Sequence, residues 1–150
     1  MFKLLGWTDY LPQQGSDHNE DIPDHLLFAD AEFKTRASTK PAPQRYPDAL
    51  AVAESKRLGL PLDAREGKQT CSPHGQILHY LPTADINSDG RIRWGILTNG
   101  RIWRLYDRSA LPRASGYYEV KFNAAPRAVL VGLTKQVVQT LGIGQPQLVP

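Results

Sequence analysis

Residues 91–106 read RIRWGILTNGRIWRLY, and they determine the architecture more firmly than any other stretch of this sequence. Before the Asn-Gly pair, large apolar residues alternate with Arg or Gly, the period of two that is typical of a strand. Asn99-Gly100 is a preferred pair for a two-residue type I′ turn, because both of its positions require positive φ. The stretch therefore predicts a β-hairpin in which Trp94 and Trp103 help to cover the core or a helix.

Two shorter apolar runs, residues 26–29 and 49–53, have the length of strands. Ser72-Pro73 predicts the start of a helix, since serine is a favoured N-cap and proline is favoured in the first turn. We expect this helix to pass through residues 76–80 and to stop near Pro82. Residues 1–22 look irregular.

Composition places the chain among globular proteins. It has 150 residues, 41% of them hydrophobic and 22% charged, which suits one domain with its own core. No apolar run approaches the ~18 residues of a membrane helix. The apolar run in the first residues is also too short for the core of a signal peptide. The single cysteine, Cys71, excludes an internal disulfide. We expect a cytoplasmic protein.

Charge is distributed unevenly along the chain. The net charge is only +3, yet residues 1–32 contain seven acidic residues and one basic residue, Lys3. Five arginines fall within residues 91–108, against one acidic residue, Asp107. An acidic patch beside a basic one suits a metal site next to a groove for a polyanion, although many surfaces without a function have the same pattern.

Several common sites are excluded. The sequence contains no phosphate-binding G-x-x-x-x-G-K-[ST] loop, no G-x-G-x-x-G after a strand and no G-x-S-x-G nucleophile elbow. Cys71, His74 and His79 lack the paired spacing and the fourth ligand that zinc prefers. We interpret these three residues as ordinary loop and helix residues.

Glu54-Ser55-Lys56 follows the second apolar run directly. Glu54 and Lys56 are two residues apart, so on a strand their side chains point to the same face. A carboxylate and an ammonium at the end of a buried strand are costly unless they pair or coordinate something. By itself this pattern is common, and a structural ion pair is the simpler interpretation.

Metal-dependent cleavage of a phosphodiester would need a second carboxylate near Glu54. Asp48, in Pro47-Asp48, precedes Glu54 on the same expected strand by six residues, or about 20 Å, too far to share a metal. Asp24, in Pro23-Asp24, opens the preceding apolar run. If residues 24–29 pair with 49–56 as antiparallel neighbours, Asp24 lies beside Glu54, and we therefore choose Asp24.

Gln76 and Tyr80 are four residues apart, on one face of the expected helix. Their amide and phenol groups are able to order a lysine or to contact a nucleotide. An ordinary helix surface would show the same spacing.

In this order, Pro23-Asp24, Glu54-x-Lys56 and Gln76-x-x-x-Tyr80 resemble the PD-(D/E)xK nuclease superfamily, in the branch with a QxxxY helix. That branch includes the N-terminal nuclease domains of type I restriction subunits and the nuclease regions of single-chain type II restriction-modification enzymes that carry a DNA adenine methyltransferase. The closest resemblance is to the single-chain type II enzymes. It covers roughly residues 4–121, and residues 83–101 are very characteristic of the group.

The resemblance implies an α/β fold, a restriction-endonuclease-like mixed sheet of four or five strands flanked by helices. It also implies a Mg²⁺-dependent DNA endonuclease that serves host defence, alone or with a methyltransferase. Asp24, Glu54 and the carbonyl of Ser55 would bind Mg²⁺, Lys56 would activate the attacking water, and Gln76 and Tyr80 would support Lys56 or contact DNA. Candidate phosphate contacts are Arg57, Arg91, Arg93, Arg101 and Arg104, each of which also suits a solvated hairpin face.

The chain departs from this family in two respects. Relatives often supply another acidic residue from a helix before the first strand, and Glu20 is a poor substitute because its segment looks like loop. The likeness fades after Val120, and no methyltransferase motif follows. We therefore expect a nuclease domain over residues 1–122, a tail or amphipathic helix over 123–150, and a truncated product. A DNA-binding fragment without catalysis, or an inactive remnant, remains the alternative.

Overall fold

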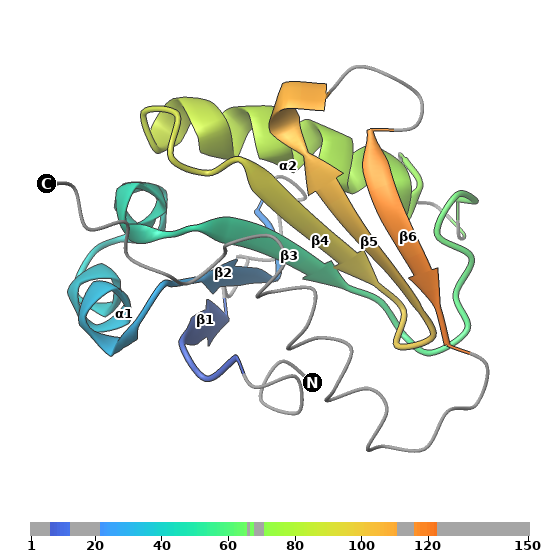
Figure 1. Ribbon diagram of the computed structural model, residues 1–150, viewed down its shortest axis with the longest axis horizontal. Helices are drawn as coiled ribbons and strands as arrows, with labels where there is room; N and C mark the ends of the chain where they lie inside the picture. The colour runs from blue at the N-terminus through green and yellow to red at the C-terminus, as the bar shows by residue number, and fades with distance from the viewer. Residues whose placement is uncertain (1–6, 13–21, 66, 68–70, 111–115, 123–150) are drawn as a thin grey trace, which may run out of the picture.

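The structure, a computed structural model, describes residues 7–12, 22–65, 67, 71–110 and 116–122. Within these residues six strands form one sheet in chain order (Figure 1). The strands are β1 (Tyr10–Pro12), β2 (His25–Leu27), β3 (Ala51–Ser55), β4 (Trp94–Thr98), β5 (Ile102–Asp107) and β6 (Tyr117–Lys121). The helical elements are α1 (Ala31–Ser38), the 3₁₀ segment η2 (Ala42–Asp48), α2 (Pro73–Asn87) and the short 3₁₀ turn η3 (Arg108–Ala110).

The sheet is mixed. β3 and β4 pair in parallel, and α2 lies between them in the chain, whereas every other neighbouring pair is antiparallel. The predicted α/β class and the predicted antiparallel pairing of β2 with β3 are therefore confirmed. The expectation of four or five strands is wrong, because the described chain has six. The segment that looked irregular contributes β1.

The predicted start of α2 is confirmed. Ser72 is the N-cap, its Oγ accepts a hydrogen bond from the backbone N–H of Gly75 at 3.1 Å, and Pro73 is the first helical residue. The hydrogen bond to Ser72 satisfies one of the backbone N–H groups that have no partner in the first turn of a helix, and Pro73 has no such N–H.

The expected stop near Pro82 is wrong, since α2 continues through that proline to Asn87. A proline inside a helix removes its own N–H bond. Leu81 and Ala84 are nevertheless buried in the same core as Ile77, so packing holds the helix together on both sides of Pro82. No helix in the described ranges is long and apolar enough to cross a membrane.

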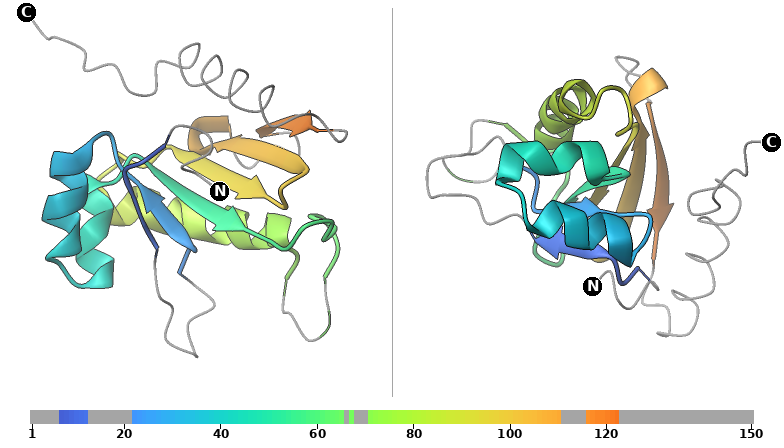
Figure 2. Two further views of the ribbon diagram at one scale, coloured as in Figure 1. Left: turned by 90° about the horizontal axis from the view of Figure 1, so that it is seen from below. Right: turned by 90° about the vertical axis from the view of Figure 1, so that its left-hand side faces the viewer.

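The two faces of the sheet carry different clusters. The first contains helical residues, among them Ala37 of α1 and Ile77 of α2, packed on Leu26, Val52 and other strand residues. Figure 2 shows α2 lying along this face. The second cluster contains no residue of a described helix, and its members are Leu27, Ala51 and Ala53, with Trp7, Tyr10, Trp94, Ile96 and Trp103 packed against them.

The β4–β5 hairpin is confirmed, but its turn differs from the prediction. Thr98 pairs with Trp103, and the backbone N–H of Asn99 donates to the carbonyl of Ile102 at 3.2 Å, which leaves Gly100 and Arg101 as the two central residues. Only Gly100 has positive φ, at 83°, which fits a type II′ turn rather than type I′. The side chain of Asn99 accepts hydrogen bonds from the backbone N–H groups of Arg101 and Ile102 at 3.0 and 2.8 Å, so Asn99 closes the turn instead of standing at its centre.

Candidate functional site

The register of β2 and β3 sets Asp24 beside Glu54. His25 pairs with Ala53, so the same antiparallel register places the next residues, Asp24 and Glu54, opposite each other. The backbone N–H of Asp24 donates a hydrogen bond to Oε2 of Glu54 at 3.2 Å. The choice between the two aspartates thus agrees with the structure.

Asp48 lies beyond the other end of β3 and has a different environment. Its buried carboxylate accepts hydrogen bonds from Arg36 Nε and Lys40 Nζ, both at 2.6 Å. These two cations keep the pKa of Asp48 below its usual value although burial alone would raise it. Asp48 therefore joins η2 to α1 and takes no part in the Glu54 cluster.

The Asp24 carboxylate is fixed to the end of β3. Its Oδ2 accepts hydrogen bonds from the backbone N–H of Ser55 at 2.8 Å and from Ser55 Oγ at 3.1 Å. Within the described part of the chain, the hydrogen bonds to this carboxylate all end on Oδ2. Oδ1 therefore accepts no hydrogen bond from the described residues.

Glu54 and Lys56 form an ion pair on the face of the sheet that α2 covers. The side chain of Glu54 is only 3% exposed and that of Lys56 15%, and Lys56 Nζ lies 2.5 Å from Glu54 Oε1. The backbone N–H of Lys56 donates to the carbonyl of Thr98 at 2.7 Å, which extends the parallel ladder one residue past β3. The motif is thus held by both neighbouring strands.

Two carboxylates and one ammonium lie close together in this cluster, and the ammonium of Lys56 pairs with Glu54. Burial raises the pKa of Glu54, the negative charge of Asp24 raises it further, and the ion pair with Lys56 offsets part of the rise. A nearby divalent cation would relieve the repulsion between the carboxylates. Mg²⁺ commonly binds through one or two protein carboxylates and keeps several waters, so this donor set fits it.

The metal-ligand set is small. In the described ranges, no three His, Cys, Asp or Glu side chains gather as a metal site. Of the ligands that the sequence predicts, only Asp24 and Glu54 contribute side chains of these types, and the third is the backbone carbonyl of Ser55. His74, considered above for zinc, instead lies with its Nδ1 2.7 Å from the hydroxyl of Tyr106.

Gln76 and Tyr80 lie on successive turns of α2, which packs on β3 and β4. Tyr80 is buried in the core beneath the helix, so its position is not an ordinary helix surface. Oε1 of Gln76 is also buried, and it accepts no hydrogen bond from the described residues. Buried acceptors usually have a donor, so Oε1 of Gln76 is able to accept a hydrogen bond on the face that carries Glu54 and Lys56.

The five candidate arginines do not form one surface. Arg57 follows the end of β3, and Arg101 follows the end of β4. Because these two strands are parallel, both arginines lie at the same edge of the sheet as Lys56. Arg91 and Arg93 precede β4 at the opposite edge, about 16 Å away for a strand of five residues. Arg93 is also engaged there, with Nε and Nη2 at 2.7 and 2.6 Å from the carboxylate of Asp107.

Arg104 is buried rather than presented to solvent, with 5% of its side chain exposed. Its Nη1 and Nη2 donate to Asp63 at 2.6 and 2.7 Å, and its Nε donates to Glu119 at 2.7 Å. The guanidinium also lies 4.6 Å from the ring centre of Tyr117. These contacts occupy three of the five N–H donors of a buried guanidinium, so the predicted phosphate contact of Arg104 is unsuited to its position.

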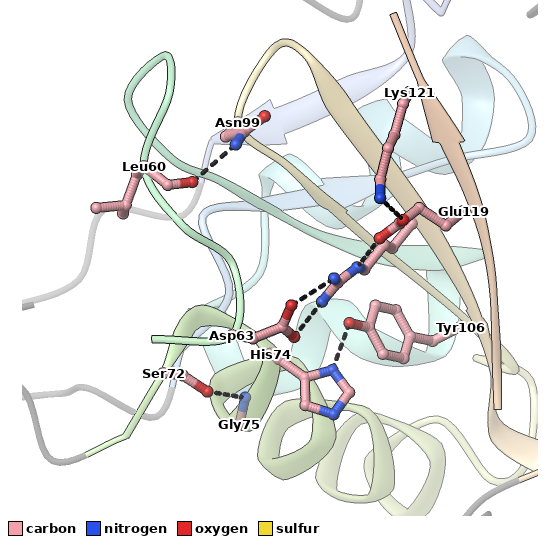
Figure 3. A network of polar contacts seen from close by, with 10 residues as sticks. Leu60, Asp63, Ser72, His74, Gly75, Asn99, Tyr106, Glu119 and Lys121 are labelled. Carbon is pink, nitrogen blue, oxygen red and sulfur yellow. Dashed lines mark hydrogen bonds and ion pairs between the residues drawn. The ribbon is translucent and has the colours of Figure 1, made fainter. Parts of the chain in front are cut away.

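The loop after Lys56 is anchored by contacts that the sequence did not predict (Figure 3). Asn99 Nδ2 donates to the carbonyl of Leu60 at 2.7 Å, and the backbone N–H of His74 donates to the carbonyl of Leu62 at 2.8 Å. Asp63 adds the ion pair with Arg104. The hairpin, the start of α2 and β5 therefore all hold the segment that leaves the site.

Predictions that concern Glu20 and residues 123–150 lie outside the described residues. Comparison of the chain with protein-family models, with curated proteins and with solved structures finds no significant match.

Proposed function

We propose that this chain is a Mg²⁺-dependent DNA endonuclease domain of a restriction-modification system, similar to the PD-(D/E)xK nucleases and acting in the cytoplasm in host defence. One observation carries the proposal. The sheet register sets Asp24 opposite Glu54, and Lys56 contacts Glu54 at the same strand end. Two carboxylates and an ammonium are the groups that metal-assisted hydrolysis of a phosphodiester requires.

Bound Mg²⁺ would polarise the scissile phosphate and lower the pKa of a water molecule. Asp24, Glu54 and the carbonyl of Ser55 would hold the metal. Lys56 would orient the attacking water and stabilise the negative charge that develops on the phosphate, because its ammonium is already fixed by Glu54. The amide of Gln76, whose Oε1 has no donor among the described residues, would support Lys56 or a bound water, and Tyr80 would fix that turn of the helix in the core.

Positions favour Arg57 and Arg101 as phosphate contacts, because they lie at the same edge of the sheet as the carboxylates. Arg91 and Arg93 would reach DNA only where a duplex also passes the opposite edge. Contacts of this kind position the DNA without reading its sequence. A methyltransferase, as a further domain or a separate subunit, would protect the host DNA.

The test is cleavage of supercoiled plasmid by the whole chain, with Mg²⁺ and with EDTA, beside the Asp24→Asn variant. We expect nicked or linear DNA with Mg²⁺ only, and a loss of cleavage in the variant, because the neutral amide replaces one of two carboxylates. Asp30→Asn is the matched control, since Asp30 caps α1 away from the site. Cleavage by Asp24→Asn at the normal rate would contradict the proposal.

A DNA-binding fragment without catalysis is the second candidate. The burial of Glu54 and its contact with Lys56 favour it, because a metal must compete with that ion pair. Salt-sensitive DNA binding without cleavage by the wild-type chain would support this candidate.

Magnesium affinity should rise with pH. The folded-state pKa of Glu54 is raised, so its proton stabilises the folded protein below the unfolded-state pKa, and this contribution is lost as the pH rises through the folded-state value. Mg²⁺ requires the ionised carboxylate. We therefore expect Mg²⁺ to raise the melting temperature little at about pH 5 and clearly at about pH 8, well above the pH at which an ordinary glutamate ionises.

The control for this titration is Glu54→Gln. That variant should remove most of the effect of Mg²⁺ at both pH values. A Mg²⁺-induced shift that is equal in the variant and in the wild-type protein would show that the metal binds elsewhere.

A further inference from the structure

The side chain of Ser55 has contacts that differ from those of its two neighbours in the motif. Successive side chains on a strand point to opposite faces, so the hydroxyl of Ser55 lies on the face opposite Glu54 and Lys56. Ser55 Oγ donates a hydrogen bond to Asp24 Oδ2 at 3.1 Å, and the backbone N–H of Ser55 donates to the same oxygen at 2.8 Å. One residue thus holds one oxygen of the carboxylate with two donors.

His25 approaches the same hydroxyl from β2. Its Nε2 lies 3.4 Å from Ser55 Oγ. A hydroxyl has a single hydrogen, and that of Ser55 points to Asp24, so the contact requires the proton on Nε2 of the ring. The backbone of His25 pairs with Pro12 on one side and with Ala53 on the other, which sets the place of the ring. The donors therefore run in one direction, from His25 through Ser55 to the carboxylate.

Two donors fix the orientation of a carboxylate better than one donor does. The terminal torsion of an aspartate is broad, so a carboxylate with a single hydrogen bond rotates easily. Here one donor belongs to the backbone of β3 and the other to a side chain, and together they fix the plane of the Asp24 carboxylate. Mg²⁺ demands near-ideal octahedral geometry, and loss of an outer-shell partner typically weakens metal binding by about 10–100-fold.

We propose that the hydroxyl of Ser55 is a positioning group that orients the Mg²⁺ ligand Asp24. The inference rests on the function proposed above, and it gives the side chain a role that differs from the one proposed for the carbonyl of Ser55. An alanine at this position keeps the carbonyl and the backbone N–H and removes only the hydroxyl. The two roles are therefore separable by mutation.

Magnesium titration of the full chain at about pH 8 tests the inference, with the rise in melting temperature as the measure of affinity. We expect Ser55→Ala to weaken Mg²⁺ binding about tenfold, the low end of the range for outer-shell partners. The same variant should need about ten times more Mg²⁺ for half-maximal cleavage of plasmid DNA. Damage to the fold alone would lower the melting temperature without Mg²⁺ and would leave the Mg²⁺ requirement unchanged.

The matched control is Ser109→Ala. The backbone N–H and Oγ of Ser109 donate to Asp107 Oδ1 at 2.9 and 2.7 Å, which is the same pair of contacts at the opposite edge of the sheet. We expect this variant to bind Mg²⁺ as the wild-type chain does. A loss of affinity as large as that of Ser55→Ala would overturn the inference, because the effect would not be specific to Asp24.

A second pair of variants keeps the inference falsifiable if Ser55→Ala fails to fold. Ser55→Thr and Ser55→Val both introduce a β-branched side chain, which suits a strand, and they differ only in a hydroxyl against a methyl group. Ser55→Thr should retain Mg²⁺ affinity, and Ser55→Val should lose it. Equal affinity in this pair, or wild-type affinity in Ser55→Ala, would overturn the inference and leave the proposed function standing. A wild-type chain that Mg²⁺ does not stabilise would overturn the proposed function, and the inference with it.

Discussion

Replacement of Lys56 by alanine should abolish DNA cleavage while DNA binding changes little. The ammonium acts on charge that develops only during attack, so its loss raises the barrier more than it weakens the ground-state complex. Loss of one such electrostatic donor costs about 10²–10³ in kcat. The measurement is a plasmid cleavage time course, with DNA affinity followed by fluorescence anisotropy.

The same variant should bind Mg²⁺ more tightly. Lys56 neutralises part of the charge on Glu54, and without it two carboxylates face the metal with no competing cation. Slower cleavage with stronger metal binding separates this role from simple damage to the site, which would weaken both. Arg91→Ala removes a positive charge at the opposite edge of the sheet and should leave cleavage and metal affinity unchanged. Normal cleavage by Lys56→Ala would remove the lysine from the mechanism.

Replacement of Arg104 by methionine should destabilise the fold by about 2 kcal/mol, which is less than the cost of breaking a fully buried ion pair, because Asp63 is 65% exposed although Arg104 is only 5% exposed. Methionine retains much of the apolar volume, so the loss reports on the contacts with Asp63 and Glu119. For a chain of this size, the melting temperature should fall by roughly 4–8 °C. Thermal unfolding followed by circular dichroism measures it.

The matched control is Arg93→Met. Arg93 makes an equally short ion pair with Asp107, but its side chain is 53% exposed, and exposed pairs contribute only about 0–1 kcal/mol. We expect the control to melt close to wild type. If Arg104→Met keeps its melting temperature and instead weakens DNA binding, Arg104 is a phosphate contact after all.

Local pattern was sufficient to predict the hairpin, the start of α2 and the two strands that carry the motif. It failed where packing overrides local preference. The helix continues past Pro82 because residues on both sides of the proline share one core. Asn99 does not lie at the centre of the turn, where the pattern predicts it, because its side chain hydrogen-bonds to the backbone of the turn. The same side chain also donates to the carbonyl of Leu60, thirty-nine residues away.

The site itself was predictable in part, since Asp24 follows from strand length and antiparallel pairing. The positions and contacts of the arginines were not predictable from the sequence. Strand β5 carries apolar residues on both faces, so alternation alone does not show that Arg104 points inward. Its carboxylate partner Asp63 is forty-one residues away, in a loop that has no distinctive sequence. The division of the other arginines between two edges depends on the parallel pairing of β3 and β4.

That parallel pairing also fixes when the site can exist. Lys56 is held in place by the carbonyl of Thr98, so the strand that completes the site contains none of the residues proposed to act in it. During synthesis, Asp24, Glu54, Lys56, Gln76 and Tyr80 all leave the ribosome before β4 does. Closing such a long crossover is an inherently late event in folding. For the nuclease that we propose, a growing chain would therefore hold the whole motif for a time without the ability to cut DNA, and would gain that ability only after β4 had docked.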